Sequence, residues 1–421
     1  MFPYTAEVDV RGRLSLGGCD AIELAAEFGT PLYVFDEDTL RGKCREFVDG
    51  FKSRYRNSSV IYACKAFINV ALAQLLLDEG LGLDVVSGGE LAVALRAGFP
   101  PERIYFHGNN KSRDELAMAL DCGIGRVVVD NFHEMSLLAE LASERGVVQD
   151  ITLRVSPGVD PHTHVYTTTG VLDSKFGFAI QTGDAQKAVE SASGESGLRL
   201  VGVHFHLGSP IFELEPYTRA MEISLEFASM VGLPLAEISP GGGFAIAYTR
   251  DQEPPPVEAY AEAISAPLPS EGGPHLVVEP GRAIVGRAGV ALYSAGAVKD
   301  VPGVRRYVSV DGGMGDNIRP ALYQAQYEAV IANKMVDEEW EAVSVAGKFC
   351  ESGDVLLRDV LIPRLEPGDI LAVPASGAYA PAMASNYNLV PRPAIVMVKD
   401  GRARLIRRRE TYEDLMRHDV V

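Results

Sequence analysis

Short apolar runs alternate with longer, helix-like stretches along the chain from residue 36 onward. Each run is rich in valine, isoleucine or leucine and has few polar positions, which is typical of strands buried on both faces. The stretches between the runs, such as 70–77 and 134–141, space their apolar residues with the period of a helix. The predicted strands are Val60–Ala63, Leu83–Val86, Arg103–Phe106, Arg126–Val129, Ile151–Val155, Leu200–Phe205, Leu235–Ile238 and His275–Val278.

Eight strand–helix units within about 250 residues predict an α/β protein with a (β/α)8 TIM-type barrel. An open, doubly wound sheet shows the same alternation, so the pattern alone leaves that alternative in place. Gly88, Gly89 and Ser112 lie where we expect barrel helices to begin.

After Arg282 the pattern changes to strand-like runs with little helical period between most of them. This change predicts a second, mostly antiparallel β domain. An early run, Pro31–Phe35, is expected to cross over and join that domain. We therefore assign residues 36–283 to the barrel, and residues 1–35 and 284–421 to the β domain. The later runs are 285–298, 306–310, 342–349, 370–373 and 395–398.

Composition narrows the class of protein and its location. The net charge of −18 argues against nucleic acid or an anionic membrane surface as a partner. No stretch approaches the roughly 18 apolar residues of a membrane span, and the first residues lack the features of an export signal. The five cysteines are scattered without disulfide or zinc-ligand spacing, so we expect a cytoplasmic protein. The basic run Arg407–Arg409 is interpreted as a solvated or interface patch.

Two predicted strands end in residues that can carry chemistry. Lys65 follows the run 60–63, and Glu279-Pro280-Gly281-Arg282 follows the run 275–278. If one barrel carries both strands, these residues meet at one rim. An amine that forms a Schiff base, a carboxylate that protonates a pyridine nitrogen and an anion-binding guanidinium suit a pyridoxal 5'-phosphate (PLP) enzyme. A lysine leaving a buried strand can also be desolvated and made nucleophilic, although an ordinary rim lysine and a surface turn are the alternatives.

The run Gly241-Gly242-Gly243 follows the predicted strand 235–238. Three glycines let the backbone approach an anion closely and point N–H groups at it, as a phosphate requires. Their spacing differs from the dinucleotide-binding G-x-G-x-x-G pattern, which counts against a Rossmann site. A plain tight turn is the alternative interpretation.

A histidine pair ends the sixth predicted run, and a serine follows it. Strand alternation would put His204 and His206 on the same face, where a metal site is conceivable. No third ligand follows at metal-like spacing, so we expect no metal. A flat imidazole stacked on a flat cofactor ring fits better, with Ser209 offered to the phosphate. His204 is equally compatible with a buried structural role.

The β domain contributes further candidates. Cys350 lies beside Glu351, which suits a proton donor next to a cation-binding group. Arg319 and Tyr323 are four residues apart, so they would share one face of a helix and could hold a carboxylate. Tyr379 follows a predicted strand and could bind a phosphate. Each of these residues alone is also compatible with a structural role.

Taken together, these motifs resemble those of the PLP-dependent decarboxylases of the alanine-racemase-like barrel fold (fold type III), and most closely the diaminopimelate decarboxylase family. The likeness runs in order from about residue 31 to residue 388. Its specific motifs are Tyr62-Ala63-Cys64-Lys65-Ala66, His107-Gly108-Asn109-Asn110-Lys111, Asp173-Ser174-Lys175-Phe176-Gly177-Phe178, Glu279-Pro280-Gly281-Arg282 and Cys350-Glu351-Ser352-Gly353-Asp354.

The resemblance implies a role for each candidate residue. Lys65 would carry the cofactor, His206 would stack on its ring and Glu279 would contact the pyridine nitrogen. The phosphate would lie among Ser209, Gly241, Gly242, Gly243, Gly281, Arg282 and Tyr379. The distal carboxylate of the substrate would meet Arg282, Arg319, Tyr323 and Tyr379. Glu351 would pair with the distal ammonium, and Cys350 would be the acid that protonates the carbanion.

The resemblance also implies the reaction and the assembly. The reaction is decarboxylation of meso-2,6-diaminopimelate to L-lysine and carbon dioxide, the last step of lysine biosynthesis. The assembly is a head-to-tail homodimer in which Cys350 reaches the site of the other subunit. Two alternatives stay open: a decarboxylase of the same fold acting on another amino acid with a distal polar group, and a non-catalytic PLP-binding or regulatory homologue.

Overall fold

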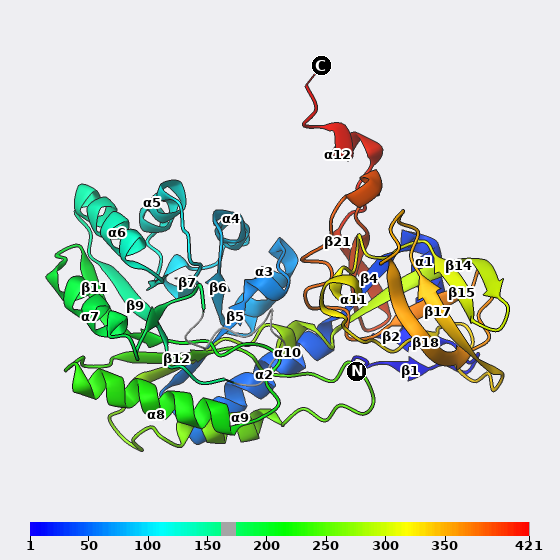
Figure 1. The fold of residues 1–421 in the computed structure, drawn as a ribbon. Coiled ribbons are helices and arrows are strands. Elements are labelled where there is room, and N and C mark those ends of the chain that lie inside the picture. The colour runs from blue at the N-terminus through cyan, green and yellow to red at the C-terminus, as the bar shows by residue number, and fades with distance from the viewer. Residues whose placement is uncertain (161–173, 421) are drawn as a thin grey trace. The chain divides into compact units, whose positions relative to one another are not determined.

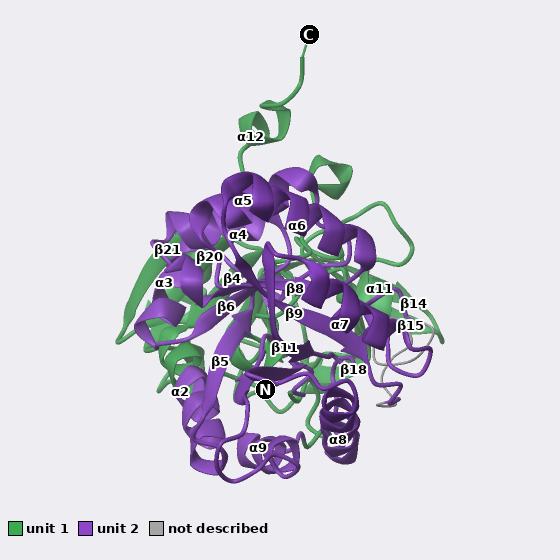
Figure 2. Cartoon of the chain, turned by 90° about the vertical axis from the view of Figure 1, so that its left-hand side faces the viewer, with its two compact units in different colours: residues 1–42, 246–253, 282–421 green, residues 43–245, 254–281 purple. Residues whose placement is uncertain are grey.

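The computed structural model describes residues 1–160 and 174–420, and the chain divides into two compact units, which Figure 2 colours separately. Unit 2 consists of residues 43–245 and 254–281, and unit 1 consists of residues 1–42, 246–253 and 282–421. Unit 2 contains the predicted barrel, and unit 1 contains the predicted β domain.

The sheet of unit 2 is a closed ring of eight parallel strands, as the apolar pattern predicted. The ring closes because β8 pairs with β9 and β13 pairs with β5, which excludes the open doubly wound sheet. In Figure 2 the strands of unit 2, in purple, are surrounded by the helices of the same unit. The strands are β5 (Ser58–Ala63), β6 (Gly82–Val85), β7 (Ile104–Phe106), β8 (Arg126–Val129), β9 (Gln149–Ser156), β11 (Leu198–His204), β12 (Glu237–Gly241) and β13 (His275–Val278), with the short β10 (Phe178–Ala179) beside β9.

The helices of unit 2 begin at polar caps that the sequence supplies. Ser87 caps α4, and Ser112 forms a capping box with Glu115 at the start of α5, so both predicted starts are confirmed. The helices are α2 (Glu37–Arg54, which begins in unit 1), α3 (Val70–Asp78), α4 (Gly88–Arg96), α5 (Arg113–Cys122), α6 (Phe132–Arg145), α7 (Asp184–Gly194), α8 (Glu215–Met230) and α9 (Val257–Ser265). None of the helices within residues 1–160 and 174–420 has the length and apolar character needed to cross a bilayer.

Unit 1 is built on a mostly antiparallel sheet, as predicted (Figure 1). The early strand β4 (Leu32–Asp36) does cross over, because it pairs with β14 on one side and with β20 on the other. The other strands of the sheet are β14 (Gly289–Val301), β15 (Arg305–Val310), β16 (Val330–Ile331), β17 (Trp340–Ala346), β18 (Val355–Pro363), β19 (Ile370–Val373), β20 (Ala394–Lys399) and β21 (Arg402–Arg407). The core beneath the sheet includes Leu14, Leu24, Leu32, Val34, Val290, Leu292 and Val396.

Short elements complete unit 1. The strands β1 (Glu7–Val8), β2 (Leu14–Leu16) and β3 (Cys19–Asp20) form a small separate sheet. The helices are α1 (Ala21–Phe28), α10 (Arg282–Val285), α11 (Arg319–Tyr323) and α12 (Tyr412–Met416). The expected strand 285–298 begins later than predicted, at residue 289, because α10 occupies the residues directly after the barrel.

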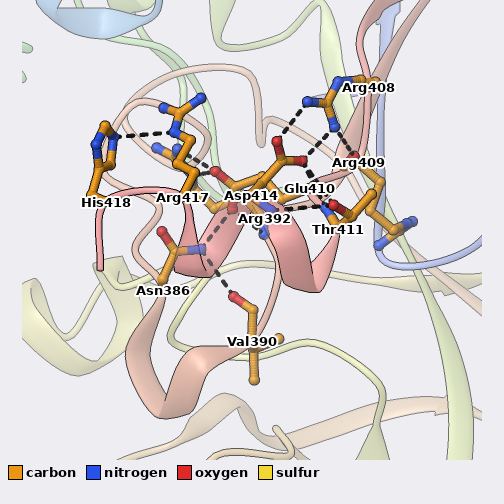
Figure 3. Close-up of polar contacts among 10 residues, drawn as sticks. All are labelled: Asn386, Val390, Arg392, Arg408, Arg409, Glu410, Thr411, Asp414, Arg417 and His418. Carbon is orange, nitrogen blue, oxygen red and sulfur yellow. Dashed lines mark hydrogen bonds and ion pairs between the residues drawn. The ribbon is translucent and has the colours of Figure 1, made fainter. Parts of the chain in front are cut away.

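The basic run near the C-terminus is paired within unit 1, which Figure 3 shows in close-up. Arg408 forms an ion pair with Asp414 of α12, and a guanidinium nitrogen of Arg409 donates to the carbonyl of Pro31 at 2.6 Å. Next to this run, Glu410 accepts hydrogen bonds from Arg392 and Asn386. The run therefore joins the C-terminal segment to the rest of unit 1, and is more than a solvated patch.

Candidate active site

The candidate site residues of unit 2 lie at or just after the carboxyl ends of the barrel strands. Strands β5 and β13 are direct neighbours, with Val278 opposite Val60. Lys65 lies in the 3-10 turn Cys64–Ala66 directly after β5, and the amide of Ala63 donates to the carbonyl of Pro280 at 3.2 Å. The two motifs that the sequence placed at one rim therefore do meet. Lys65 itself is exposed at this strand end.

Glu279 is buried at the end of β13, and two barrel residues donate hydrogen bonds to its carboxylate. His204 Nε2 lies 3.1 Å from Oε2, and the hydroxyl of Ser239 donates to Oε1 at 2.9 Å. The side chain of Glu279 is 5% exposed, and such a buried charge is stable only when protein groups hold it. Both donors come from the ends of neighbouring strands, β11 and β12. Ser239 carried no signal in the sequence.

His107 and Asp84 extend this network, and sequence reasoning missed both as site residues. His107 Nε2 lies 3.4 Å from Glu279 Oε1 and 3.7 Å from Asp84 Oδ1. Its ring packs edge-on against His204, with centroids 4.8 Å apart. Both side chains are buried, and within the described residues His107 Nε2 and Asp84 Oδ1 make no hydrogen bond.

The pKa values of Glu279 and Asp84 shift in opposite directions. Burial opposes ionisation of Glu279, but His204, His107 and Lys65 together outweigh it and hold the pKa of Glu279 below its ordinary value. Burial, followed by the charge of Glu279, raises the pKa of Asp84 well above its ordinary value. Burial also lowers the pKa of His107 and of His204. The surroundings therefore favour the ionised form of Glu279 and the protonated form of Asp84.

The same network brings together three side chains of the kind that bind metal ions, a group that the sequence did not reveal. Ligand atoms of His107, His204 and Glu279 all lie within 4.8 Å of one another. His107 follows a strand far along the chain from His204, so spacing in the sequence could not indicate the group. The oxygens of Glu279 accept hydrogen bonds from His204 and Ser239.

The glycine run forms a tight cradle at the end of β12. A Cβ atom on Gly242 would lie 2.3 Å from the carbonyl oxygen of Glu279, and one on Gly243 would lie 2.6 Å from the carbonyl oxygen of Gly208. Gly241 and Gly243 also have positive φ angles, 72° and 109°, which favour glycine. Any side chain in this run would therefore clash with neighbouring backbone.

Two of the three amide groups of the glycine run donate to neighbouring side chains in this structure. The amide of Gly241 donates to the hydroxyl of Ser239 at 3.1 Å, and that of Gly242 donates to His206 Nδ1 at 3.3 Å. The second bond fixes the half-buried ring of His206 against the cradle. Burial and the charge of Lys65 lower the pKa of His206 well below its ordinary value, so the ring is neutral.

A cluster of arginines and tyrosines forms the polar centre of unit 1. Arg282 donates to the hydroxyl of Tyr248 at 2.6 Å, and Arg319 donates to the hydroxyl of Tyr327. The guanidinium of Arg282 also lies 4.9 Å from the ring of Tyr379. Tyr248 and Tyr327, which lie in loops, were missed from the sequence.

The remaining candidates of unit 1 lie in a short helix and in a left-handed bend of the backbone. The segment Arg319–Tyr323 is helical, which meets the condition under which Arg319 and Tyr323 share a face, with Arg319 buried and Tyr323 half-buried. Tyr379 has a φ angle of 62°, a left-handed backbone conformation that is costly for a bulky residue.

Cys350 and Glu351 are both exposed, in a loop whose shape depends on a buried carboxylate. Asp354 accepts hydrogen bonds from the amides of Met314 and Phe349, at 2.7 and 2.8 Å. The amide of Cys350 donates to the side chain of Asn388 at 3.0 Å. These bonds hold the thiol and the carboxylate at the tip of the loop.

The residues of unit 2 fit PLP. An exposed amine (Lys65), an ionised carboxylate held by donors (Glu279) and a backbone cradle closed to side chains (Gly241–Gly243) lie at adjacent strand ends. The buried His107 Nε2, without a hydrogen-bond partner in the described chain, lies beside the same carboxylate. Among the sequence motifs, Asp173 lies outside the described residues.

Comparisons with known proteins agree with this chemistry. Residues 38–286 match the family model described as "Pyridoxal-dependent decarboxylase, pyridoxal binding domain". The chain is 48% identical to a diaminopimelate decarboxylase of Bacillus subtilis over 99% of this chain and 97% of the relative. A solved diaminopimelate decarboxylase from M. jannaschii in co-complex with L-lysine has a TM-score of 0.93 and 36% identity, and the match covers 100% of this chain and 99% of that one.

Proposed function

Because the chain belongs to the diaminopimelate decarboxylase family of pyridoxal-dependent enzymes, we propose that it converts meso-2,6-diaminopimelate into L-lysine and carbon dioxide. In this reaction one Cα–carboxylate bond breaks, carbon dioxide leaves, and a proton replaces it on the same carbon. The observation that carries the proposal is the buried carboxylate of Glu279 at the end of β13, which accepts hydrogen bonds from His204 and Ser239. His204, His107 and Lys65 hold the pKa of this carboxylate below its ordinary value.

PLP, when bound, draws off the electron pair that the departing carbon dioxide leaves behind. Lys65 would hold the cofactor covalently, and His206, fixed by the amide of Gly242, would stack on its ring. Its phosphate would lie among Ser209, the glycine cradle, the backbone of Gly281 and Arg282, and the hydroxyl of Tyr379.

Glu279 would hold a proton on the pyridine nitrogen. A carboxylate can do this only while it is itself ionised, and the hydrogen bonds from His204 and Ser239 favour that state. A protonated ring is a stronger electron sink, which suits a reaction that releases a full carbanion. This electrostatic requirement favours decarboxylation over reactions that need less charge delocalisation.

The substrate carries a second carboxylate and a second ammonium at its far end. We assign the carboxylate to Arg282, Arg319, Tyr323 and Tyr379, because two buried guanidiniums with adjacent hydroxyls suit a planar anion. Glu351 would pair with the ammonium. Lysine and ornithine as substrates would present only a bare ammonium here, so they offer nothing to the arginines.

Cys350 would donate the proton that replaces the carboxylate. Its exposed position in unit 1 suits a residue that reaches the site of a second subunit, and we propose a homodimer with shared active sites. In this assignment residues 36–283 bind PLP, while residues 1–35 and 284–421 supply substrate-binding and interface residues. We further propose that the enzyme acts in the cytoplasm.

The proposal is tested by incubating the purified protein with meso-diaminopimelate, with and without added PLP. Carbon dioxide and L-lysine should appear in equal amounts, and more of both when PLP is supplied. Parallel incubations with L-lysine and L-ornithine should release little carbon dioxide. Preferred turnover of either of these amino acids would identify a different substrate, and no release from any of the three would contradict the proposed activity.

A further inference from the structure

Two tyrosines of unit 1, Tyr248 and Tyr327, contact the buried arginines, and nothing assigned above gives them a role. Tyr248 accepts a hydrogen bond from Arg282 at 2.6 Å, and its ring lies 4.5 Å from the guanidinium of Arg319. Tyr327 accepts a hydrogen bond from Arg319, and its ring lies 5.4 Å from the same guanidinium. Tyr248 therefore touches both arginines.

The chemistry of these partners is unusual for buried arginines. A buried guanidinium is ordinarily paired with a carboxylate, which neutralises it. In the part of the chain that the structure describes, no Asp or Glu forms an ion pair with Arg319. A phenol hydroxyl is a neutral acceptor, so it fixes the direction of a guanidinium and leaves the positive charge for another anion.

Ring packing makes the arrangement rigid. Tyr248 and Tyr327 meet edge to face, with centroids 5.3 Å apart and an interplanar angle of 84°. Both rings are buried, at 7% and 4% exposure. Burial raises the pKa of Tyr248, but the charges of Arg282 and Arg319 outweigh burial and bring that pKa below its ordinary value.

We propose that Tyr248 and Tyr327 are specificity-determining positioning residues, which orient Arg282 and Arg319 toward the distal carboxylate of the substrate. The inference rests on the proposed function, because it takes that carboxylate as the ligand of the two arginines. Without the hydroxyls the arginines stay charged but lose their fixed direction. Recognition of the carboxylate then weakens, while recognition of the amine end does not change.

The test compares two amines that differ by one carboxylate. L-lysine is the product, so when it binds in the product orientation it keeps the distal carboxylate that the arginines would hold. Cadaverine lacks this carboxylate, so the ratio of the two dissociation constants isolates recognition of that group. Binding to the PLP-loaded holoenzyme is followed through the visible absorbance of the cofactor, for the wild type and for Tyr248→Phe and Tyr327→Phe. We expect the Kd of L-lysine to rise about 10-fold, as when a hydrogen bond to a charged group is lost. The Kd of cadaverine should stay within about 2-fold.

Tyr33→Phe is the matched control, because Tyr33 is also buried in unit 1 and its hydroxyl donates to the carbonyl of Asp316 at 2.6 Å. Within residues 1–160 and 174–420, Tyr33 makes no hydrogen bond to either arginine. It should leave the ratio unchanged. Equal losses for both amines, or a wild-type ratio in both variants, would overturn the inference. If the wild-type enzyme releases carbon dioxide from meso-diaminopimelate and both variants keep the wild-type ratio of dissociation constants, the role of the tyrosines is rejected and the proposed function stands. If one variant fails to fold, the other decides the question by the same ratio.

Discussion

In unit 2 the buried carboxylate of Glu279 accepts hydrogen bonds from His204 and Ser239, whereas in unit 1 the buried guanidiniums of Arg282 and Arg319 donate to tyrosine hydroxyls. The first arrangement favours the ionised form of the Glu279 carboxylate and fixes its position within the barrel. The second fixes the direction of the guanidiniums, because a phenol oxygen accepts a hydrogen bond without carrying a compensating charge.

The difference indicates a division of labour between the two clusters. The barrel cluster adjusts a protonation state, so changes to it should act on the rate of the chemical step. The arginine–tyrosine cluster recognises one group of the substrate, so changes to it should act on affinity and selectivity.

The largest effect is expected for Lys65→Ala, which removes the amine that would bind PLP covalently. Activity should fall to the background level, and borohydride should no longer fix a pyridoxyl group to the protein. Peptide mapping after reduction of the wild type should place the label on Lys65. The exposed Lys187→Ala on α7 serves as the control, and a label on any other lysine would contradict the assignment.

A smaller but still large loss is expected for Arg319→Gln. Losing a charged hydrogen-bonding partner costs about 1.5–3 kcal/mol, so kcat/KM for meso-diaminopimelate should fall roughly 10- to 100-fold, mostly through KM. Arg305→Gln, which breaks the exposed ion pair with Asp359, should have little effect on either parameter. Steady-state kinetics that show an unchanged KM for Arg319→Gln would separate this arginine from the substrate.

Mixing two inactive variants tests the shared site. If Cys350 serves the neighbouring subunit, each Lys65→Ala/Cys350→Ala heterodimer has one intact site of two. Random exchange makes about half of the molecules heterodimers, so about a quarter of full activity should return. Native mass spectrometry shows whether exchange took place. Exchange without any recovery would mean that Cys350 acts within its own chain or does not act.

The smallest effect is expected for His204→Phe, which keeps a flat ring beside His107 but removes the donor to Glu279. In the wild type the pKa of Glu279 lies below its ordinary value, so its ionised form is lost only as the pH falls through that low pKa. Without the donor the pKa rises, and the acidic limb of the kcat profile should move to higher pH. His275→Phe, at the opposite end of β13, should leave the limb in place.

The sequence predicted the barrel well because all eight strands are buried, so their apolar runs stand out. It missed β21 (Arg402–Arg407), an edge strand that pairs through its backbone while arginine side chains face solvent. It also missed β18 (Val355–Pro363), whose apolar pattern Arg358 and Asp359 interrupt.

For the site, the sequence provided residues within recognisable motifs, such as Lys65, Glu279 and the glycine run. It did not reveal Ser239, His107 or Tyr248, because their roles arise from contacts between segments that are far apart along the chain. Local patterns carry information about strands and helices, but not about which distant side chains share a proton or orient a charge. The direction of the Gly241 and Gly242 amides likewise depends on neighbours, Ser239 and His206.

The division of labour is tested most directly by the steady-state kinetics of Glu279→Gln with meso-diaminopimelate. The control is Glu237→Gln, because Glu237 is a buried glutamate at the other end of the barrel and accepts a hydrogen bond from Tyr105. The amide cannot hold a proton on the cofactor ring, so kcat should fall about 10²-fold or more, the scale for losing an electrostatic stabiliser. KM should change little, and Glu237→Gln should keep its kcat. A Glu279→Gln enzyme with near-normal kcat, or one whose loss lies mainly in KM, would contradict the account.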